Sequence, residues 1–332
     1  MRSMRVLFTL LVLAAAAAAG AAAWWLQRPL PLAAETVEVD IEAGTTPRAI
    51  ADAWVQAGVK TSPTLLYQYF RWSGQSRRIR AGSYEIGRGT TPMALLNKMV
   101  RGDETLAVVR IIDGWTFKQV RAELARADSL KPTTAAMDDA QIMAALGDPG
   151  VPAEGQFYPD TYAYSKGSTD LAVLRRAHRA MKKRLADAWQ QRSPDSPLKT
   201  MDEALILASI VEKETGAATD RGKVAGVFVN RLRLNMPLQT DPSVIYGLGD
   251  AFDGNLRKRH LTTDGPYNTY TRAGLPPTPI SIPGKASLLA AVKPEPTKAL
   301  YFVSRGDGTS VFSDNLSAHN RAVNQYQRGK PQ

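Results

Sequence analysis

Residues Thr200–Gly216 read TMDEALILASIVEKETG, and this stretch decides the fold. Thr200 can cap the start of a helix, and acidic side chains follow in the first turn, where they favour helix formation. The run from Ala204 to Val211 is apolar on every side, which is typical of a helix buried inside a domain. Gly216 is a suitable C-terminal stop. The stretch therefore predicts a central, buried helix.

The last turn of this helix carries a candidate acid, Glu214. It lies one turn beyond Ile210 and two turns beyond Ile206, so it continues an apolar stripe. Burial and the negative end of the helix dipole both disfavour a charged carboxylate there, so we expect a raised pKa for Glu214. A carboxyl group that stays protonated near neutral pH can act as a general acid. The alternative, from this motif alone, is an exposed Glu-Lys-Glu helix end.

Glu212 is the neighbouring candidate. Residues two apart on a helix point about 200° apart, so Glu212 and Glu214 cannot flank one glycosidic bond as a pair of carboxylates must. The spacing favours chemistry that depends on a single carboxyl group.

The N-terminus predicts a membrane anchor. No charged residue occurs from Val6 to Gln27, a run long enough to cross a bilayer core of ~30 Å as a helix. Arg2 and Arg5 precede the run and two tryptophans end it, which places the N-terminus in the cytoplasm and the rest of the chain outside. A cleaved signal peptide is the alternative, because an Ala-Ala-Ala sequence at 21–23 resembles a cleavage site.

Composition narrows the partners and the chemistry. The chain has 332 residues, a net charge of +11 and no cysteine, which excludes disulfides and thiolate chemistry. A basic cluster between Arg175 and Arg184 falls on a predicted helix spanning Asp170 to Gln191. The cluster can be explained as the solvent-exposed face of this helix. Binding to nucleic acid is not expected, because an exported chain seldom meets it. Anionic lipid headgroups and the carboxylates of wall peptides are the anions expected there.

A strand, a Gly-Thr or Gly-Trp turn and a helix recur along the first part of the chain. The strands are predicted at Val37–Ile41, Tyr84–Ile86 and Val108–Ile112, and each is followed by a glycine and a threonine that can cap a helix. The uneven spacing argues against a solenoid. Thr36–Glu104 resembles a LysM-like module, a class associated with glycans that contain N-acetylglucosamine. The alternative is that the repeat is architecture alone.

The rest of the chain is predicted to mix helices with long loops. Thr133–Gly150 is expected to hold a helix between loops, and Leu238–Pro283 is rich in turn residues and expected to be mostly loop, which is usually functional. A hairpin is predicted around Gly306-Asp307-Gly308, and a closing helix near Ser317. The histidines match no metal-ligand spacing, and no nucleophile elbow, phosphate loop or dinucleotide fingerprint occurs, so we expect no metal and no cofactor.

Several long motifs follow one another along the chain. They are Glu154–Tyr162 (EGQFYPDTY), Leu207–Thr215 (LASIVEKET), Val227–Leu232 (VFVNRL), Leu238–Gly247 (LQTDPSVIYG), Tyr267–Tyr270 (YNTY), Gly274–Pro277 (GLPP) and Ile282–Gly284 (IPG). In this order they resemble the YceG-like endolytic murein transglycosylases, and the resemblance covers Thr36 to the C-terminus and includes the anchor. One departure is Asp113, where the family usually has glutamate. Another is the separation of Pro152 from Glu154, which are commonly adjacent in the family.

The resemblance implies cleavage of the MurNAc–GlcNAc β-1,4 bond within glycan strands, with 1,6-anhydro-MurNAc ends. Glu214-Thr215 fits the Glu-Ser/Thr pair of lytic transglycosylases better than Glu212-Lys213, so Glu214 is the expected catalytic residue. Candidate groove residues, each with the alternative of fastening a loop, are Glu154, Asn230, Gln239, Asp241, Tyr246, Tyr267 and Asn268.

We therefore expect an α+β protein that is anchored in the inner membrane by a single helix, with its catalytic domain in the periplasm. The expected parts are a cytoplasmic tail and anchor (1–27), a linker (28–35), a LysM-like module (36–104) and a mixed α+β catalytic domain (105–330). Peptidoglycan glycan strands are the expected substrate, and the resemblance suggests peptidoglycan synthases as neighbours. A hydrolytic muramidase and a non-catalytic wall-binding scaffold are the alternatives.

Overall fold

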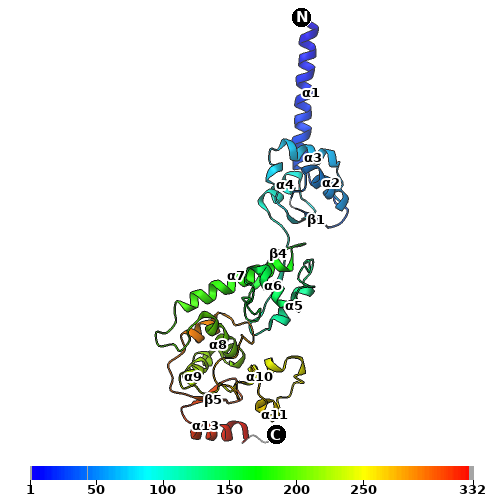
Figure 1. The fold of residues 1–332 in the computed structure, drawn as a ribbon. Helices are drawn as coiled ribbons and strands as arrows, with labels where there is room; N and C mark the ends of the chain where they lie inside the picture. Colours follow the sequence, from blue (N-terminus) through cyan, green and yellow to red (C-terminus); the bar gives the residue numbers. More distant parts are fainter. Residues whose placement is uncertain (1, 43, 329–332) are drawn as a thin grey trace. The chain divides into compact units, whose positions relative to one another are not determined.

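The computed structural model describes residues 2–42 and 44–328, and it contains helices and short two-stranded ladders, as the α+β prediction requires (Figure 1). The chain divides into two compact units. The first contains residues up to 107 together with 128–130 and 163–168. The second contains 108–127, 131–162 and the chain from 169 onward.

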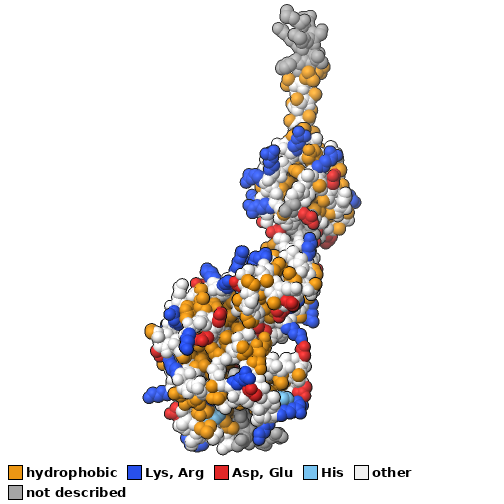
Figure 2. Space-filling view, viewed as in Figure 1, with side chains coloured by type: hydrophobic (Ala, Val, Ile, Leu, Met, Phe, Trp, Pro, Cys, Tyr) orange, Lys and Arg blue, Asp and Glu red, His pale blue; other side chains and the backbone are white. Residues whose placement is uncertain are grey.

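The N-terminal helix α1 spans Arg2–Gln27. Its part from Thr9 to Gln27 is long and apolar enough to cross a membrane and is not buried in the protein, although a signal sequence has the same properties. Figure 2 shows hydrophobic and uncharged side chains along the described part of this helix. Near its end Trp25 contacts Tyr69 edge to face, with 6.2 Å between ring centroids, so the end of the helix packs against α3 within the first unit.

The first unit is built around one antiparallel ladder, which pairs Thr36 with Gly87 and Ile41 with Gly82. Two helices lie between its strands in sequence, and a third follows. The core beneath them includes the fully buried side chains of Trp54, Phe70 and Tyr84. The elements are β1 (Thr36–Ile41), α2 (Pro47–Ala57), α3 (Pro63–Trp72), the 3-10 turn η1 (Ser76–Arg78), β2 (Gly82–Gly87) and α4 (Pro92–Arg101).

The three predicted turns do start helices. Thr46, Thr91 and Thr116 each accept a hydrogen bond from a backbone N–H of the first helical turn, which satisfies a donor that has no partner within the helix. The glycine before each cap has a positive φ of 78° to 91°, a conformation that favours glycine over any residue with a side chain. The same local chemistry thus recurs in both units.

The second unit is mainly helical. Strands β3 (Leu106–Arg110) and β4 (Thr161–Ser165) pair with each other, and the division between the two units falls within both strands. Strands β5 (Tyr301–Ser304) and β6 (Ser310–Ser313) form an antiparallel hairpin in the second unit. The remaining elements are α5 (Phe117–Arg126), α6 (Asp139–Leu146), α7 (Asp170–Trp189), α8 (Met201–Glu214), η2 (Ala218–Asp220), α9 (Arg221–Arg233), α10 (Asp241–Leu248), η3 (Gly249–Ala251), α11 (Lys258–Thr262), α12 (Lys285–Val292), α13 (Leu316–Val323) and the π-helix η4 (Asn324–Arg328).

Helix α8 is the centre of the second unit, as its sequence predicts. Every residue from Ala204 to Val211 is buried, and the helix contacts α7, α9, α10 and α12 (Figure 1). Its one buried hydroxyl, Ser209, accepts a hydrogen bond from the backbone N–H of Ile280 at 3.0 Å. The Ser281 hydroxyl donates to the backbone carbonyl of Ser209, also at 3.0 Å. These bonds hold the loop at 280–284 against α8.

Two segments match their predictions. The segment at 238–283 is mostly loop, and within it lie the short helices α10, where Pro242 is in the first turn and Val244 is buried beneath the helix, and α11. The helix expected within 133–150 is α6, between a capping box at Asp138 and a left-handed Gly147.

Candidate active site

Glu214 is the last residue of α8, and its carboxyl group lies where the helix reaches an open groove. Oε1 accepts a hydrogen bond of 2.6 Å from the hydroxyl of Thr240, which is itself almost fully buried. Burial raises the pKa of Glu214, the negative charge of Asp241 raises it further, and the bond from Thr240 lowers it. The net direction is upward, as the position of Glu214 on the apolar stripe predicts.

Glu212 performs a different task on another side of the same helix. Its Oε2 accepts a hydrogen bond of 2.8 Å from the backbone N–H of Gly284, and its Oε1 lies 3.7 Å from the guanidinium of Arg221. A Cβ on Gly284 would meet the carboxyl of Asp113 at 2.8 Å, so a larger residue there would displace the Asp113 side chain. Glu212 therefore fastens the loop at Gly284 to α8, and it does not line the groove that contains Glu214.

Glu214 opens into a groove with a cavity volume of about 640 Å³. Residues on α9, the loop before α10, the β5–β6 hairpin and α13 form its walls, and most of the side chains are polar or aromatic. The residues other than Glu214 are Gly216, Arg231, Leu238, Gln239, Asp241, Tyr270, Tyr301, Phe302, Val303, Ser304, Gly308, Ser310, Leu316, His319, Asn320, Val323 and Gln327.

Two of the predicted groove residues, Gln239 and Asp241, line this cavity with Glu214. Gln239 has a positive φ of 50°, held by a hydrogen bond from its backbone N–H to the carbonyl of Thr269. Asp241 accepts a bond of 2.6 Å from the hydroxyl of Tyr270. The groove therefore contains a second carboxylate, Asp241, whose negative charge raises the pKa of Glu214.

The structure places Glu154, which is buried, and Tyr246, which is half-buried, outside the groove lining. Glu154 is only 8% exposed and accepts hydrogen bonds from the backbone N–H of Phe117 at 3.0 Å and from the hydroxyl of Tyr246 at 3.3 Å. Burial is the main reason that the pKa of Glu154 rises to about 7. In this structure the two residues hold the start of α5 and α10 together, which is the loop-fastening alternative.

The other predicted residues also make structural bonds. Asn230 donates from Nδ2 to the carbonyls of Thr297 and Ala299, and this fixes the approach to β5. Tyr267 and Asn268 line a separate cavity beside α10. The geometry thus brings Glu214, Gln239 and Asp241 together and distributes the other five around them.

Sequence reasoning missed several residues of the groove. Arg231 is 7% exposed and donates to the carbonyls of Leu300 at 2.7 Å and Leu238 at 3.0 Å, so it joins opposite walls. The ring of His319 stacks on Tyr301 at 5.1 Å. Among the described residues, Nδ1 of His319 has no hydrogen-bond partner, although it is buried. In the sequence, His319 matches no metal-ligand spacing, and no local pattern indicates that it lines a groove.

Within residues 2–42 and 44–328, no group of three or more histidine or acidic side chains is placed to hold a metal ion. The groove itself offers carboxyl, hydroxyl and imidazole groups. A desolvated carboxyl group of raised pKa that lines an open groove can act as a general acid.

Comparisons with known proteins place the chain in a family. It belongs to the YceG-like family, whose model matches residues 39–325. It is 31% identical to an endolytic murein transglycosylase of Bacillus subtilis (strain 168), over 88% of this chain and 85% of that protein. It is 26% identical to an endolytic murein transglycosylase of Streptococcus pneumoniae serotype 2 (strain D39 / NCTC 7466), over 91% of this chain and 61% of that protein.

A solved structure agrees with the family. The crystal structure of a YceG-like protein from Listeria monocytogenes superposes with a TM-score of 0.54 at 28% sequence identity, and the match covers 86% of this chain and 98% of that one.

Proposed function

We propose that this protein is an endolytic peptidoglycan transglycosylase that cleaves the MurNAc–GlcNAc β-1,4 bond within glycan strands. The observation that carries the proposal is the carboxyl group of Glu214, desolvated and of raised pKa, in an open groove of about 640 Å³. The names of the curated relatives supply the substrate class.

Glu214 acts first as acid and then as base. Its proton goes to the glycosidic oxygen as the bond from C1 to that oxygen breaks, and this leaves a carboxylate. The carboxylate then takes the proton of the MurNAc C6 hydroxyl, whose oxygen bonds to C1. The product ends in 1,6-anhydro-MurNAc, no water is consumed, and Glu214 is protonated again. Thr240, which donates to Oε1, leaves the other oxygen of the carboxyl group for the substrate.

A hydrolytic muramidase is the second candidate, and Asp241 is the observation that favours it. A hydrolase needs a second carboxylate to activate water or to bond to the sugar, and Asp241 lines the same groove. The hydroxyl of Tyr270 holds Asp241 at 2.6 Å, and in the transglycosylase Asp241 serves to keep Glu214 protonated. A non-catalytic scaffold has no use for a desolvated acid.

The proposal extends to the location. We place α1 in the inner membrane with the N-terminus in the cytoplasm and the catalytic domain (105–330) in the periplasm, where nascent strands lie beside the peptidoglycan synthases. We assign 36–104 as a LysM-like, glycan-binding module; the strand-helix-helix-strand order of β1, α2, α3 and β2 supports this.

Two experiments test these points. Purified full-length protein is incubated with long glycan strands, and the product lengths are followed: internal cleavage gives fragments of mixed length at early times, whereas release of disaccharides from the ends would contradict an endolytic enzyme. For the anchor, cells are extracted with alkaline carbonate. Retention of the full-length chain in the membrane is expected, and release of a shortened soluble chain would support the signal-peptide alternative.

A further inference from the structure

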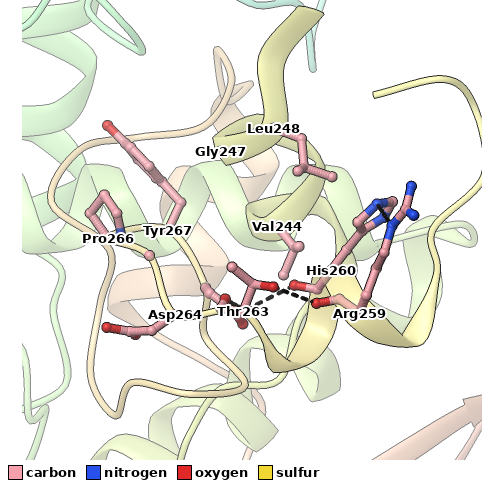
Figure 3. Close-up of a pocket in the computed structure, with 11 residues that line it drawn as sticks. Val244, Gly247, Leu248, Arg259, His260, Thr263, Asp264, Pro266 and Tyr267 are labelled. Carbon is pink, nitrogen blue, oxygen red and sulfur yellow. Dashed lines mark hydrogen bonds between the residues drawn. The ribbon is translucent and has the colours of Figure 1, made fainter. Parts of the chain in front are cut away.

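A second cavity, of about 310 Å³, lies beside α10 in the second unit (Figure 3). Val244 and Leu248 of α10 line it, and Pro266 and Tyr267 contribute further apolar surface. Figure 3 shows the side chains of Arg259 and His260 side by side on one flank. The remaining lining residues are Gly247, Thr263, Asp264, Gly265 and Asn268. The cavity thus combines an apolar surface with a basic edge.

The charged side chains that line this cavity leave a net positive charge. Asp264 is neutralised by Arg272, whose Nε and Nη2 lie 2.9 Å and 2.8 Å from its two carboxylate oxygens. Arg259 makes no ion pair with an acidic side chain among the described residues, and its Nε contacts Nε2 of His260 at 3.2 Å. One unpaired guanidinium remains, which suits an anionic ligand and above all a carboxylate.

The walls are fixed before any ligand arrives. Nδ2 of Asn268 donates to the carbonyls of His260 at 3.0 Å and Thr263 at 2.6 Å, so it closes the loop that follows α11. The hydroxyl of Tyr267 is bonded to that of Thr278 at 2.8 Å. Gly247 has no room for a Cβ, which would meet the Cβ of Tyr267 at 2.9 Å. A cavity held in this way loses little freedom when a ligand binds.

Helix α10 connects this cavity to the groove. Asp241 lines the groove, and Val244, Gly247 and Leu248 line the cavity. Steps of three and four residues put these four on one face of the helix. Gly247 lies six residue steps after Asp241, which is about 9 Å along the helix axis. A short chain attached to a sugar in the groove could therefore reach the cavity along one face of α10.

We propose that this cavity binds the stem peptide of a muramyl residue held in the groove, with Arg259 on a peptide carboxylate. The proposal rests on the function proposed above, because the peptide is attached to MurNAc. Peptide residues in extended form span about 3.5 Å each, so the first three cover the distance along α10. Wall peptides carry free carboxylates and alanyl methyl groups, which match the basic edge and the apolar wall. The enzyme then prefers strands that bear peptides.

The first test compares two substrates: glycan strands with their stem peptides, and the same strands after an amidase has removed the peptides. The ratio of kcat/KM for the two is measured for the wild type, Arg259→Ala and Arg259→Glu. Loss of a charge-assisted hydrogen bond lowers the preference for peptide-bearing strands by about tenfold. Lys258→Ala is the matched control, because it removes the same charge from α11 without lining the cavity, and its ratio stays at the wild-type value. An unchanged ratio in both Arg259 variants overturns the proposal.

The second test is independent of cleavage. Full-length Glu214→Gln protein in detergent is titrated calorimetrically with a soluble muramyl tripeptide, and with the same compound after its carboxylates are amidated. Amidation or Arg259→Ala each weakens binding by about tenfold. Equal binding of the amidated compound overturns the proposal. If the wild type cleaves neither substrate but the muramyl tripeptide binds through Arg259, the proposed function fails and the peptide site stands.

Discussion

The hydroxyl of Thr240 donates a hydrogen bond of 2.6 Å to Oε1 of Glu214 and joins the loop before α10 to the end of α8. The backbone N–H of Thr240 donates in turn to Oγ1 of Thr269 at 3.0 Å, so the residue that orients the acid is itself held in place. Next to it, Asp241 adds a negative charge. Two successive residues thus shift the pKa of Glu214 in opposite directions: Thr240 lowers it and Asp241 raises it.

Thr240→Val should move the alkaline limb of the pH–activity profile to higher pH. The bond from Thr240 favours the charged form of Glu214, so its removal raises the pKa and keeps the acid protonated further into the alkaline range. The loss of orientation should lower kcat by about tenfold. Thr240→Ser retains the hydroxyl and should resemble the wild type. A shift to lower pH in the valine variant would contradict this account of the carboxyl group.

Asp241→Asn should have the opposite effect on pH dependence. Removal of the negative charge lowers the pKa of Glu214, so the acid form disappears at lower pH and the alkaline limb moves down. The asparagine can still accept from Tyr270, and cleavage continues below the new pKa with anhydro ends. Kinetics at several pH values test this. Near-complete loss of activity at every pH would assign Asp241 the role of base or nucleophile in a hydrolase.

The sequence was sufficient to predict the parts of this site that follow from local rules. A buried helix ending at Glu214, three threonine caps after glycine turns and the β5–β6 hairpin all depend on nearby residues. The partners of these elements depend on how distant segments pack. The contact of Thr240 with Glu214, and the stacking of His319 on Tyr301, join residues that no local pattern relates.

The same reason explains why only some of the candidate polar residues lie in the groove. Packing places Glu154 where it bonds to the backbone N–H of Phe117 and to the hydroxyl of Tyr246, and it places the ring of Tyr246 against that of Tyr267. Glu212 and Glu214 were separated correctly because the period of a single helix fixes their relative directions.

Glu154 should make stability depend on pH. Its pKa rises from an ordinary 4.5 to about 7 in the folded protein. The unfolded chain therefore releases this proton first, and the free energy of unfolding falls between about pH 4.5 and pH 7 by about 3 kcal/mol in total. Glu154→Gln removes this dependence and flattens the profile in that window. Denaturation in urea at a series of pH values measures the difference.

The control for that series is Asp187→Asn, which changes an exposed carboxyl group on α7. Its profile should follow the wild type. Parallel profiles for Glu154→Gln and the wild type would show that Glu154 is ionised in the folded protein.

His319→Phe should weaken substrate binding while kcat is retained. Phenylalanine can stack on Tyr301 as the imidazole does, but it lacks the polar ring nitrogens of a residue that lines the groove. The loss of one hydrogen bond to a sugar would raise KM by about threefold to tenfold. His319→Asn keeps a polar side chain at this position and should restore part of the affinity. An unchanged KM in both variants would remove His319 from the binding surface.

The central claim is that the carboxyl group of Glu214 cleaves the strand without water, and the measurement that tests it most directly is the mass of the new ends. Strands are digested with the wild type, Glu214→Gln and the matched variant Glu212→Gln, and the products are analysed by mass spectrometry. The account predicts 1,6-anhydro ends from the wild type and no cleavage by Glu214→Gln. Acid–base assistance alone contributes ~10²–10⁴-fold, and one group here supplies both steps. Glu212→Gln, whose carboxylate holds Gly284, should still give anhydro ends. Reducing ends from the wild type, or anhydro ends at a near-normal rate from Glu214→Gln, would contradict it.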